Sequence, residues 1–232
     1  MKFSTSLILI AIFPIFIGAA ETTISGNTME LVDRGESVLF KGDVKLERGT
    51  DVIKADWMQT SKYKDKINAK GQVELQRFMP DGEKIKAFGD TAFFNSKSGE
   101  GYILGSRKKL SHVIYTQVVS STASKTLDMY AKRFDFSENA TTGTASGTVY
   151  GKSPDEESGM PYEFWSDQAD LDNQSKSIRL TGIVQPKVKQ AFPGGNRTIT
   201  GDTIVYSYEA KKFQAQGRAQ AVFVEIKKAE SK

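Results

Sequence analysis

Apolar and polar residues alternate with a period of two along much of this chain. Between positions 67 and 75 every odd-numbered residue is apolar or glycine, while Lys70, Gln72 and Glu74 occupy even-numbered positions. Positions 40–46 and 213–223 show the same alternation. Because successive side chains of a β-strand point to opposite faces, this pattern predicts strands with one buried and one solvated face.

Two short phrases recur in a fixed order along these segments. In the first, a small or apolar residue and a spacer precede a glycine, and copies lie at 40–46, 69–75, 145–149, 180–184 and 215–219, with a degenerate copy at 103–105. In the second, an aspartate follows a small residue, as at Asp56, Asp90, Asp167 and Asp202. Each aspartate precedes the next glycine by 15 positions, at Gly71, Gly105, Gly182 and Gly217. The chain is therefore a repeated β unit.

Polar turn segments separate the two phrases. They lie at 64–66, 96–99, 173–176 and 209–212 after the aspartates, and at 48–50, 80–82 and 193–195 after the glycines. Turns of this kind between alternating segments are typical of hairpins. We therefore expect an all-β fold built as a long antiparallel meander.

Each predicted strand of the repeated unit is long enough to need a bend. About ten residues at about 3.3 Å each span about 30 Å, and strands of that length twist or bend. The central glycine is the expected place for the bend, since glycine within a strand marks a bulge, a corner or a close backbone approach. The glycines could also only relieve crowding inside a narrow sheet, which is compatible with a bend.

The recurring aspartates have two interpretations. A column of carboxylates could bind a cation, or each aspartate could accept backbone hydrogen bonds beside a turn or bulge. Lys132 stands where an aspartate is expected, 15 positions before Gly147, and a carboxylate site does not easily tolerate lysine. The sequence favours the structural role.

The third unit is irregular. Gly105 and Gly147 are 42 positions apart, whereas Gly147, Gly182 and Gly217 follow at intervals of 35. The excess falls at 107–126, which includes a β-rich stretch from Val113 to Val119. The segment from Lys152 to Pro161 is a second irregularity, and we interpret it as a mobile surface loop.

The N-terminus resembles an export signal. Lys2 precedes an apolar run at 7–17, and small residues at 18–20 precede Glu21. The run is shorter than the roughly 20 residues that cross a bilayer, which favours a cleaved signal over a retained anchor. The predicted organisation is a signal peptide at 1–20, one β domain at 21–226 and a polar tail at 227–232, in a protein located in the periplasm.

Composition narrows the classes of function. The chain has no cysteine, so disulfides and a lipid-modified cysteine are excluded. Its formal net charge of +4 becomes +3 without Lys2, which suggests an anionic lipid or glycan partner more than nucleic acid. His112 is the single histidine, so a histidine-based catalytic triad or a zinc site lacks residues, and we expect an ordinary surface histidine.

Paired carboxylates are the remaining hydrolytic option. Asp167, Asp170 and Asp172 form the densest acidic group in a strand context, and the last two would share one face. Polysaccharide-cleaving parallel β-helices are the enzymatic alternative, but their coils are shorter and lack such hairpin turns. No glycine loop opens a helix for nucleotide binding. We expect a protein without enzymatic activity, cofactor or metal.

The paired phrases resemble the LptA/OstA-like family of periplasmic lipopolysaccharide-transport proteins. The strongest stretch is 38–87, where the phrases at 40–44, 53–56 and 69–73 occur in the family's order and spacing. The resemblance returns at 164–223. It implies an open-ended, twisted β-jellyroll with an apolar interior, whose members stack end to end between the inner and outer membranes. It also implies strand addition at the open ends with an LptC-like inner-membrane partner and an LptD-like outer-membrane partner.

A lipid-binding interior fits the alternating pattern. Each exposed CH₂ of an acyl chain costs about 0.8 kcal/mol in water, so a lipid in transit needs an apolar shield. The candidate lining residues are those predicted on the buried face: Val44, Leu46, Ile53, Val73, Leu75, Ile85, Ile103, Val149, Ile178, Leu180, Val184 and Ile199.

Three hypotheses of function remain open at this point. The first is a periplasmic carrier that shields lipopolysaccharide, alone or as a head-to-tail homo-oligomer. The second is an LptC-like partner in the same system, tethered by an uncleaved segment at 7–17. The third is a ligand-free, self-associating β-solenoid whose open edges serve only assembly.

Overall fold

The structure is a computed structural model that describes residues 22–225 apart from positions 62, 64, 79–83, 96, 121–122, 138–141, 155–160, 173–174, 176, 193, 208–209 and 211. The predicted signal at 1–20, the tail at 227–232 and most of the predicted loop between Lys152 and Pro161 lie outside the described residues. The described part is almost entirely β-structure, as the alternating pattern predicts, with one short 3-10 helix at Asp33–Gly35.

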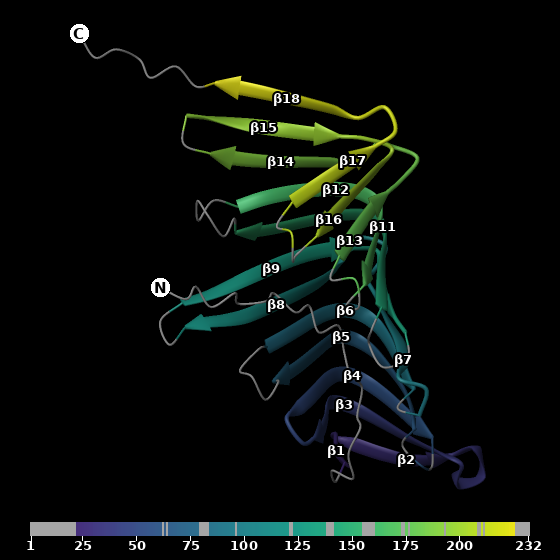
Figure 1. The fold of residues 1–232 in the computed structure, drawn as a ribbon. Coiled ribbons are helices and arrows are strands. Elements are labelled where there is room, and N and C mark those ends of the chain that lie inside the picture. The colour runs from purple at the N-terminus through teal and green to yellow at the C-terminus, as the bar shows by residue number, and fades with distance from the viewer. Residues whose placement is uncertain are drawn as a thin grey trace.

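The strands fall into a first and a second half of the chain (Figure 1). The first half contains β1 (Thr22–Ser25), β2 (Thr28–Val32), β3 (Ser37–Arg48), β4 (Asp51–Ser61), β5 (Lys66–Phe78), β6 (Lys84–Asn95), β7 (Glu100–Leu104), β8 (Ser111–Ser120) and β9 (Ala123–Ala131). The second half contains β10 (Arg133–Phe136), β11 (Thr142–Pro154), β12 (Pro161–Asp172), β13 (Ser177–Thr181), β14 (Lys187–Phe192), β15 (Gly195–Thr200), β16 (Thr203–Ser207), β17 (Lys212–Gln216) and β18 (Gln220–Glu225).

All pairings between these strands are antiparallel and join them into one sheet that bends into two layers. Strands β3, β4, β5, β6, β11 and β12 run through both layers. Layer A also contains β2, β7, β10, β13, β16 and β17. Layer B also contains β1, β8, β9, β14, β15 and β18. The result is an open-ended, twisted β-jellyroll, as expected.

The chain passes from one layer to the other along a line that we call the corner ridge. It comprises residues 26–27, 42–43, 55–56, 71–72, 89–90, 105–110, 131–132, 147–148, 166–167, 182–186, 201–202 and 217–219. Figure 1 shows the strands turning there, on the right of the view. Both repeated phrases lie on this ridge: the glycines lead from layer A to layer B, and the aspartates lead back.

The corner at Gly71 shows how the phrase works. Gly71 (φ 74°) and Gln72 (φ 46°) both adopt the left-handed conformation, and the pairing register with β6 shifts between Lys70 and Val73. Glycine adopts this conformation at little cost, and an extra residue in one strand bends it. The predicted bend at the glycine is therefore confirmed.

Residues of the two phrases that lie 15 positions apart in the sequence are hydrogen-bonded to each other across a corner. The backbone N–H of Lys132 donates to the carbonyl of Gly147 at 3.0 Å, and that of Asp202 donates to Gly217 at 2.9 Å. Asn27 makes the same bond to the Gly42 carbonyl at 2.9 Å. Asn27 is thus a further member of the second phrase. Its residue type differs from the other members because the shared bond uses only the backbone.

The irregular third unit keeps the topology of the others but has a long hairpin in layer B, whose strands β8 and β9 hold 10 and 9 residues. Strands β8 and β9 pair with each other and fit between β6 and β11. The β-rich stretch predicted from Val113 to Val119 lies within β8. The excess residues therefore lengthen this hairpin and the corner before it, and leave the layers continuous.

Candidate functional site

The candidate site is the inner face between the two layers. The predicted lining residues of layer B are buried: Val44, Leu46, Ile53, Val73, Leu75, Ile85 and Val149 are at most 5% exposed. Those of layer A, which are Ile103, Ile178 and Leu180, are at most 2% exposed. These side chains belong to one apolar cluster that extends from β3 to β16. The structure thus brings them together on one side of the bent sheet.

Two predicted lining residues differ from this group. Ile199 is only partly buried, although it packs against the core. Val184 is 72% exposed, so its assignment to the buried face is wrong. It lies in a corner that holds extra residues, and Val188, which is 1% exposed, takes the inner position opposite Phe164. Val184 and Val188 share parity, so alternation alone cannot tell which of them is buried when a corner gains four residues.

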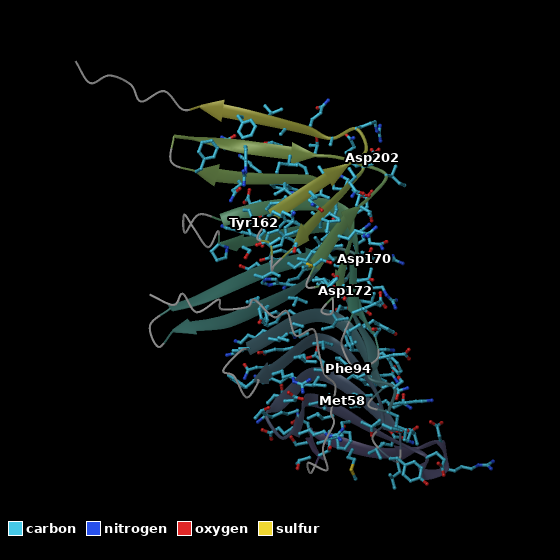
Figure 2. The ribbon with its side chains drawn as sticks, in the orientation of Figure 1. Met58, Phe94, Tyr162, Asp170, Asp172 and Asp202 are labelled. Carbon is cyan, nitrogen blue, oxygen red and sulfur yellow. The ribbon has the colours of Figure 1, made fainter. Side chains whose placement is uncertain are left out.

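Aromatic residues on the same face were not among the predicted lining residues. Phe94 and Phe136 stack with ring centroids 5.6 Å apart, and Tyr162, Tyr206 and Phe213 form a second group with centroids 4.6–5.4 Å apart. Figure 2 labels Phe94 in the first half of the sheet and Tyr162 in the second. Within its own side of a corner each alternates with less buried residues, as Phe94 does together with Ala92 and Tyr206 together with Ile204, so alternation could have identified them.

Small residues line the inside of the corner ridge. Alanines flank the corners on the inner face and are at most 5% exposed: Ala55, Ala69, Ala87, Ala92, Ala131, Ala145 and Ala169. Small side chains let the two layers approach closely at the ridge. The layers are joined at this ridge, and the hairpin turns lie on the opposite side.

One buried ion pair lies at a hairpin end of layer B. Asp51 is 8% exposed, and Nε of Arg77 lies 3.3 Å from its Oδ1. Burial raises the pKa of Asp51 to about 6, against the opposing effect of Arg77 and Arg48. Burial also lowers the pKa of Arg77, with Asp51 acting in the opposite direction. The carboxyl group is therefore costly to ionise in the folded protein.

His112 is not the ordinary surface residue that the sequence suggested. Its ring stacks between Phe88 and Tyr130 at centroid distances of 5.8 and 4.1 Å, and its Nε2 lies 3.1 Å from Oδ1 of Asp128. The stack continues through Tyr150 to Trp165 on the outer face. The histidine thus belongs to a row of rings that crosses layer B.

The acidic residues singled out as possible catalysts take part in local hydrogen bonds. Asp170 accepts from Thr144 Oγ1 at 3.1 Å and from Gln168 Nε2 at 2.7 Å, while Asp172 accepts from the Ser175 N–H at 3.1 Å. Figure 2 labels both aspartates on β12. Among the described residues, no three histidine, cysteine or acidic side chains are grouped to hold a metal ion.

Asp167 acts as the structural hypothesis for the aspartates requires. Its Oδ2 accepts hydrogen bonds from the backbone N–H groups of Ile183 at 2.7 Å and Val184 at 3.2 Å. Asp202 differs, because its Oδ1 binds the side chains of Arg218 at 2.6 Å and Gln185 at 3.3 Å. The aspartates therefore stabilise corners by more than one kind of bond.

Cavities formed by described residues lie at the ridge and at the hairpin ends. One of about 320 Å³ is lined at the ridge by Gly89, Asp90, Gly105 and Lys109, among others. Another of about 360 Å³ lies at the hairpin ends of β6, β7, β10 and β11. Both have mixed polar and apolar walls without a group of catalytic side chains.

The sheet has free edges at its two ends. Within the described residues, β1 and β2 pair only with β3, while β17 pairs only with β16 and β18 only with β15. These edges lie at opposite ends of the molecule in Figure 1. Apolar side chains are exposed on them: Met29 and Leu31 at one end, and Val222, Phe223 and Val224 at the other.

The part of the chain that the structure describes contains no helix with the length and apolarity needed to cross a lipid bilayer. Comparison with curated proteins found no match. A search of solved structures matches this chain to LptH, the LptA homologous periplasmic component of the lipopolysaccharide transport device from Pseudomonas aeruginosa. The match covers 88% of this chain and 94% of LptH, at 11% identity and a TM-score of 0.31. The family model of the LptA/(LptD N-terminal domain) LPS transport proteins matches residues 23–212. The chain therefore belongs to this lipopolysaccharide-transport family.

Proposed function

We propose that this protein is a non-enzymatic periplasmic carrier that shields the acyl chains of lipopolysaccharide between its two layers, on the way from the inner to the outer membrane. The observation that carries the proposal is the continuous apolar inner face, which runs through the corners from β3 to β16. The lining residues are the buried aliphatic side chains named above together with Ile199. Val184 is not among them, because it is exposed on the ridge.

Acyl chains would enter on the side opposite the corner ridge. The inner side chains of the two layers pack on one another, so a lipid must replace contacts between the layers. Such an exchange is feasible because apolar contacts are not directional and one apolar surface substitutes for another. Acyl chains removed from water in this way gain about 0.8 kcal/mol for each CH₂.

Photo-crosslinking in cells that make lipopolysaccharide tests the proposal. An aliphatic diazirine residue at Leu180 or Ile199 should form a lipid adduct. The matched control is Arg179, the exposed neighbour of Leu180 on the opposite face of β13. Absence of lipid adducts at all inner positions, or equal labelling at Arg179, would contradict the carrier function.

The free edges support strand addition with partners. The edges of β1 and β2 would accept an LptC-like inner-membrane component, and those of β17 and β18 an LptD-like outer-membrane component. Head-to-tail copies would join β18 to β1 in layer B and β17 to β2 in layer A. Since the chain has no cysteine, Thr23→Cys with Val222→Cys should give an oxidation-dependent ladder of oligomers, whereas Thr23→Cys with Gln214→Cys should not.

The competing hypotheses have separate tests. A purified protein that begins at Glu21 would exclude the membrane-tethered partner. Native mass spectrometry would identify a ligand-free structural module, because its ordered oligomers would contain no lipid. Oligomers that retain lipopolysaccharide are the result expected of the carrier.

A further inference from the structure

Two corners of the ridge are longer than the others. At the corner of β5, the buried Val73 follows Gly71 by two positions. Ser111 and Val188 are the equivalent buried residues of β8 and β14, and they follow Gly105 and Gly182 by six positions. Four extra residues at each corner therefore project from the ridge.

The corner between β13 and β14 carries an apolar tip. Ile183 is 99% exposed and Val184 is 72% exposed. Their backbone N–H groups are held by the Asp167 carboxylate, at 2.7 and 3.2 Å. Pro186 is buried and fixes the other end of the tip. The turn thus presents two aliphatic side chains to solvent in a defined position.

The corner between β7 and β8 carries a basic tip. Arg107, Lys108 and Lys109 are consecutive and exposed. The hydroxyl of Ser106 accepts hydrogen bonds from the backbone N–H groups of Lys108 at 3.2 Å and Lys109 at 3.1 Å. Lys132, on the next corner, is also exposed. Four cations are therefore gathered on this part of the ridge.

Acidic groups on this part of the ridge offset few of these charges. Asp90 is exposed beside the basic tip. Asp167 is bound to backbone N–H groups, and Asp202 is paired with Arg218 at 2.6 Å. The exposed Asp43 and Asp56 lie farther along, on the corners of β3 and β4. The cationic and apolar character is thus confined to the ridge between β7 and β14.

The two tips project from the same ridge. Four strand-to-strand steps separate their corners, through β9, β11 and β12, which places them about 20 Å apart along one ridge. We propose that this ridge docks on the surface of an anionic lipid bilayer. Ile183 and Val184 insert beneath the headgroups, while Arg107, Lys108 and Lys109 bind lipid phosphates. This docking surface is separate from the inner face and does not depend on the proposed carrier function.

A single fluorescent label tests the insertion. A chain that starts at Glu21 contains every strand pairing of the fold and lacks the apolar N-terminal run, which could bind vesicles by itself. Because the chain has no cysteine, Ile183→Cys can carry an environment-sensitive dye. The matched control is Ser175→Cys, an exposed position beyond the opposite end of β13.

Vesicles of phosphatidylethanolamine and phosphatidylglycerol should shift the emission of the dye at position 183 to the blue and leave that at position 175 unchanged. Vesicles of phosphatidylcholine should shift neither. Equal responses of the two labels, or no response at position 183, would overturn the proposal.

Vesicle flotation with unlabelled variants tests the two tips separately. Ile183→Ser with Val184→Ser, and Lys108→Gln with Lys109→Gln, should each weaken binding to the anionic vesicles by about tenfold. The control is Lys66→Gln with Lys152→Gln, which removes two exposed cations away from the ridge and should change binding by at most about twofold. Equal losses in the two lysine pairs would indicate general charge attraction and overturn docking through the ridge.

Discussion

The side chain of Asp56 occupies the space that Gly71 leaves open. A Cβ atom on Gly71 would lie 2.3 Å from Oδ2 of Asp56, closer than such atoms approach in proteins. The same relationship links Asp167 to Gly182 and Asp202 to Gly217, at 2.6 and 2.4 Å. The 15-residue interval in the sequence is therefore a direct contact across a corner.

Gly71→Ala should destabilise the fold, because alanine at this position meets both a left-handed backbone and the Asp56 side chain. We expect a loss of about 2–3 kcal/mol in the free energy of unfolding, measured by urea denaturation. Gly35→Ala is the matched control, since Gly35 also has positive φ but no atom within 4 Å of the added Cβ. It should cost only about 1 kcal/mol. In the background of Asp56→Gly, which also removes the Asp56 Cβ atom 2.9 Å away, the cost of Gly71→Ala should fall. An unchanged cost would show that the contact is not limiting.

Because Val184 is exposed, its substitution should be tolerated, although the alternation along the sequence predicted a core residue at this position. Val184→Ala should change the free energy of unfolding by less than about 0.5 kcal/mol. Val188→Ala, only four positions along, removes a buried side chain and should cost about 2 kcal/mol. Equal effects in chemical denaturation would contradict the assignment of Val188 to the inner face.

Asp51 should make stability depend on pH. Burial raises its pKa from the ordinary 3.8 to about 6 in the fold, so the folded state binds more protons than the unfolded state between these pH values. The contribution of Asp51 to the free energy of unfolding is therefore greatest below about pH 4. It falls by about 3 kcal/mol at most as the pH rises to about 6. Urea denaturation across this range should show the slope in the native protein and a flatter profile in Asp51→Asn.

Asp65 provides the control for this experiment. Hydrogen bonds from Lys97 and Ser61 lower its pKa to about 2, so it stays ionised across the same pH range. Asp65→Asn should therefore leave the slope between pH 4 and 6 intact. A slope that survives in Asp51→Asn would assign the titration to another group.

The stacked row on layer B predicts a structural role for His112. His112→Ala opens a gap between Phe88 and Tyr130 and should cost about 1–2 kcal/mol in the free energy of unfolding. His112→Phe keeps the stacking and loses only the contact with Asp128, so it should retain most of the stability. If both variants lose the same stability, the Asp128 contact is the important one.

Much of the fold could be predicted because its causes are local. The alternation around Val73 indicates which side chains point inward, and the glycine phrase indicates where the backbone bends. Both depend on a few neighbouring residues, so they can be recognised without knowing which strands pair. The same reasoning failed for Asn27, whose membership in the repeat rests on a backbone bond that any residue can make.

The repeat, the alternating faces, the bends and the family resemblance follow from the order of residues along the chain. The packing of the strands is needed to place Val184 outside, His112 in a stack and Asp51 in a buried pair with Arg77. The physical reason is that a residue's environment depends on the strands beside it. Four added residues at a corner displace Val184 and bring Val188 inward without disturbing the period-two pattern on either side.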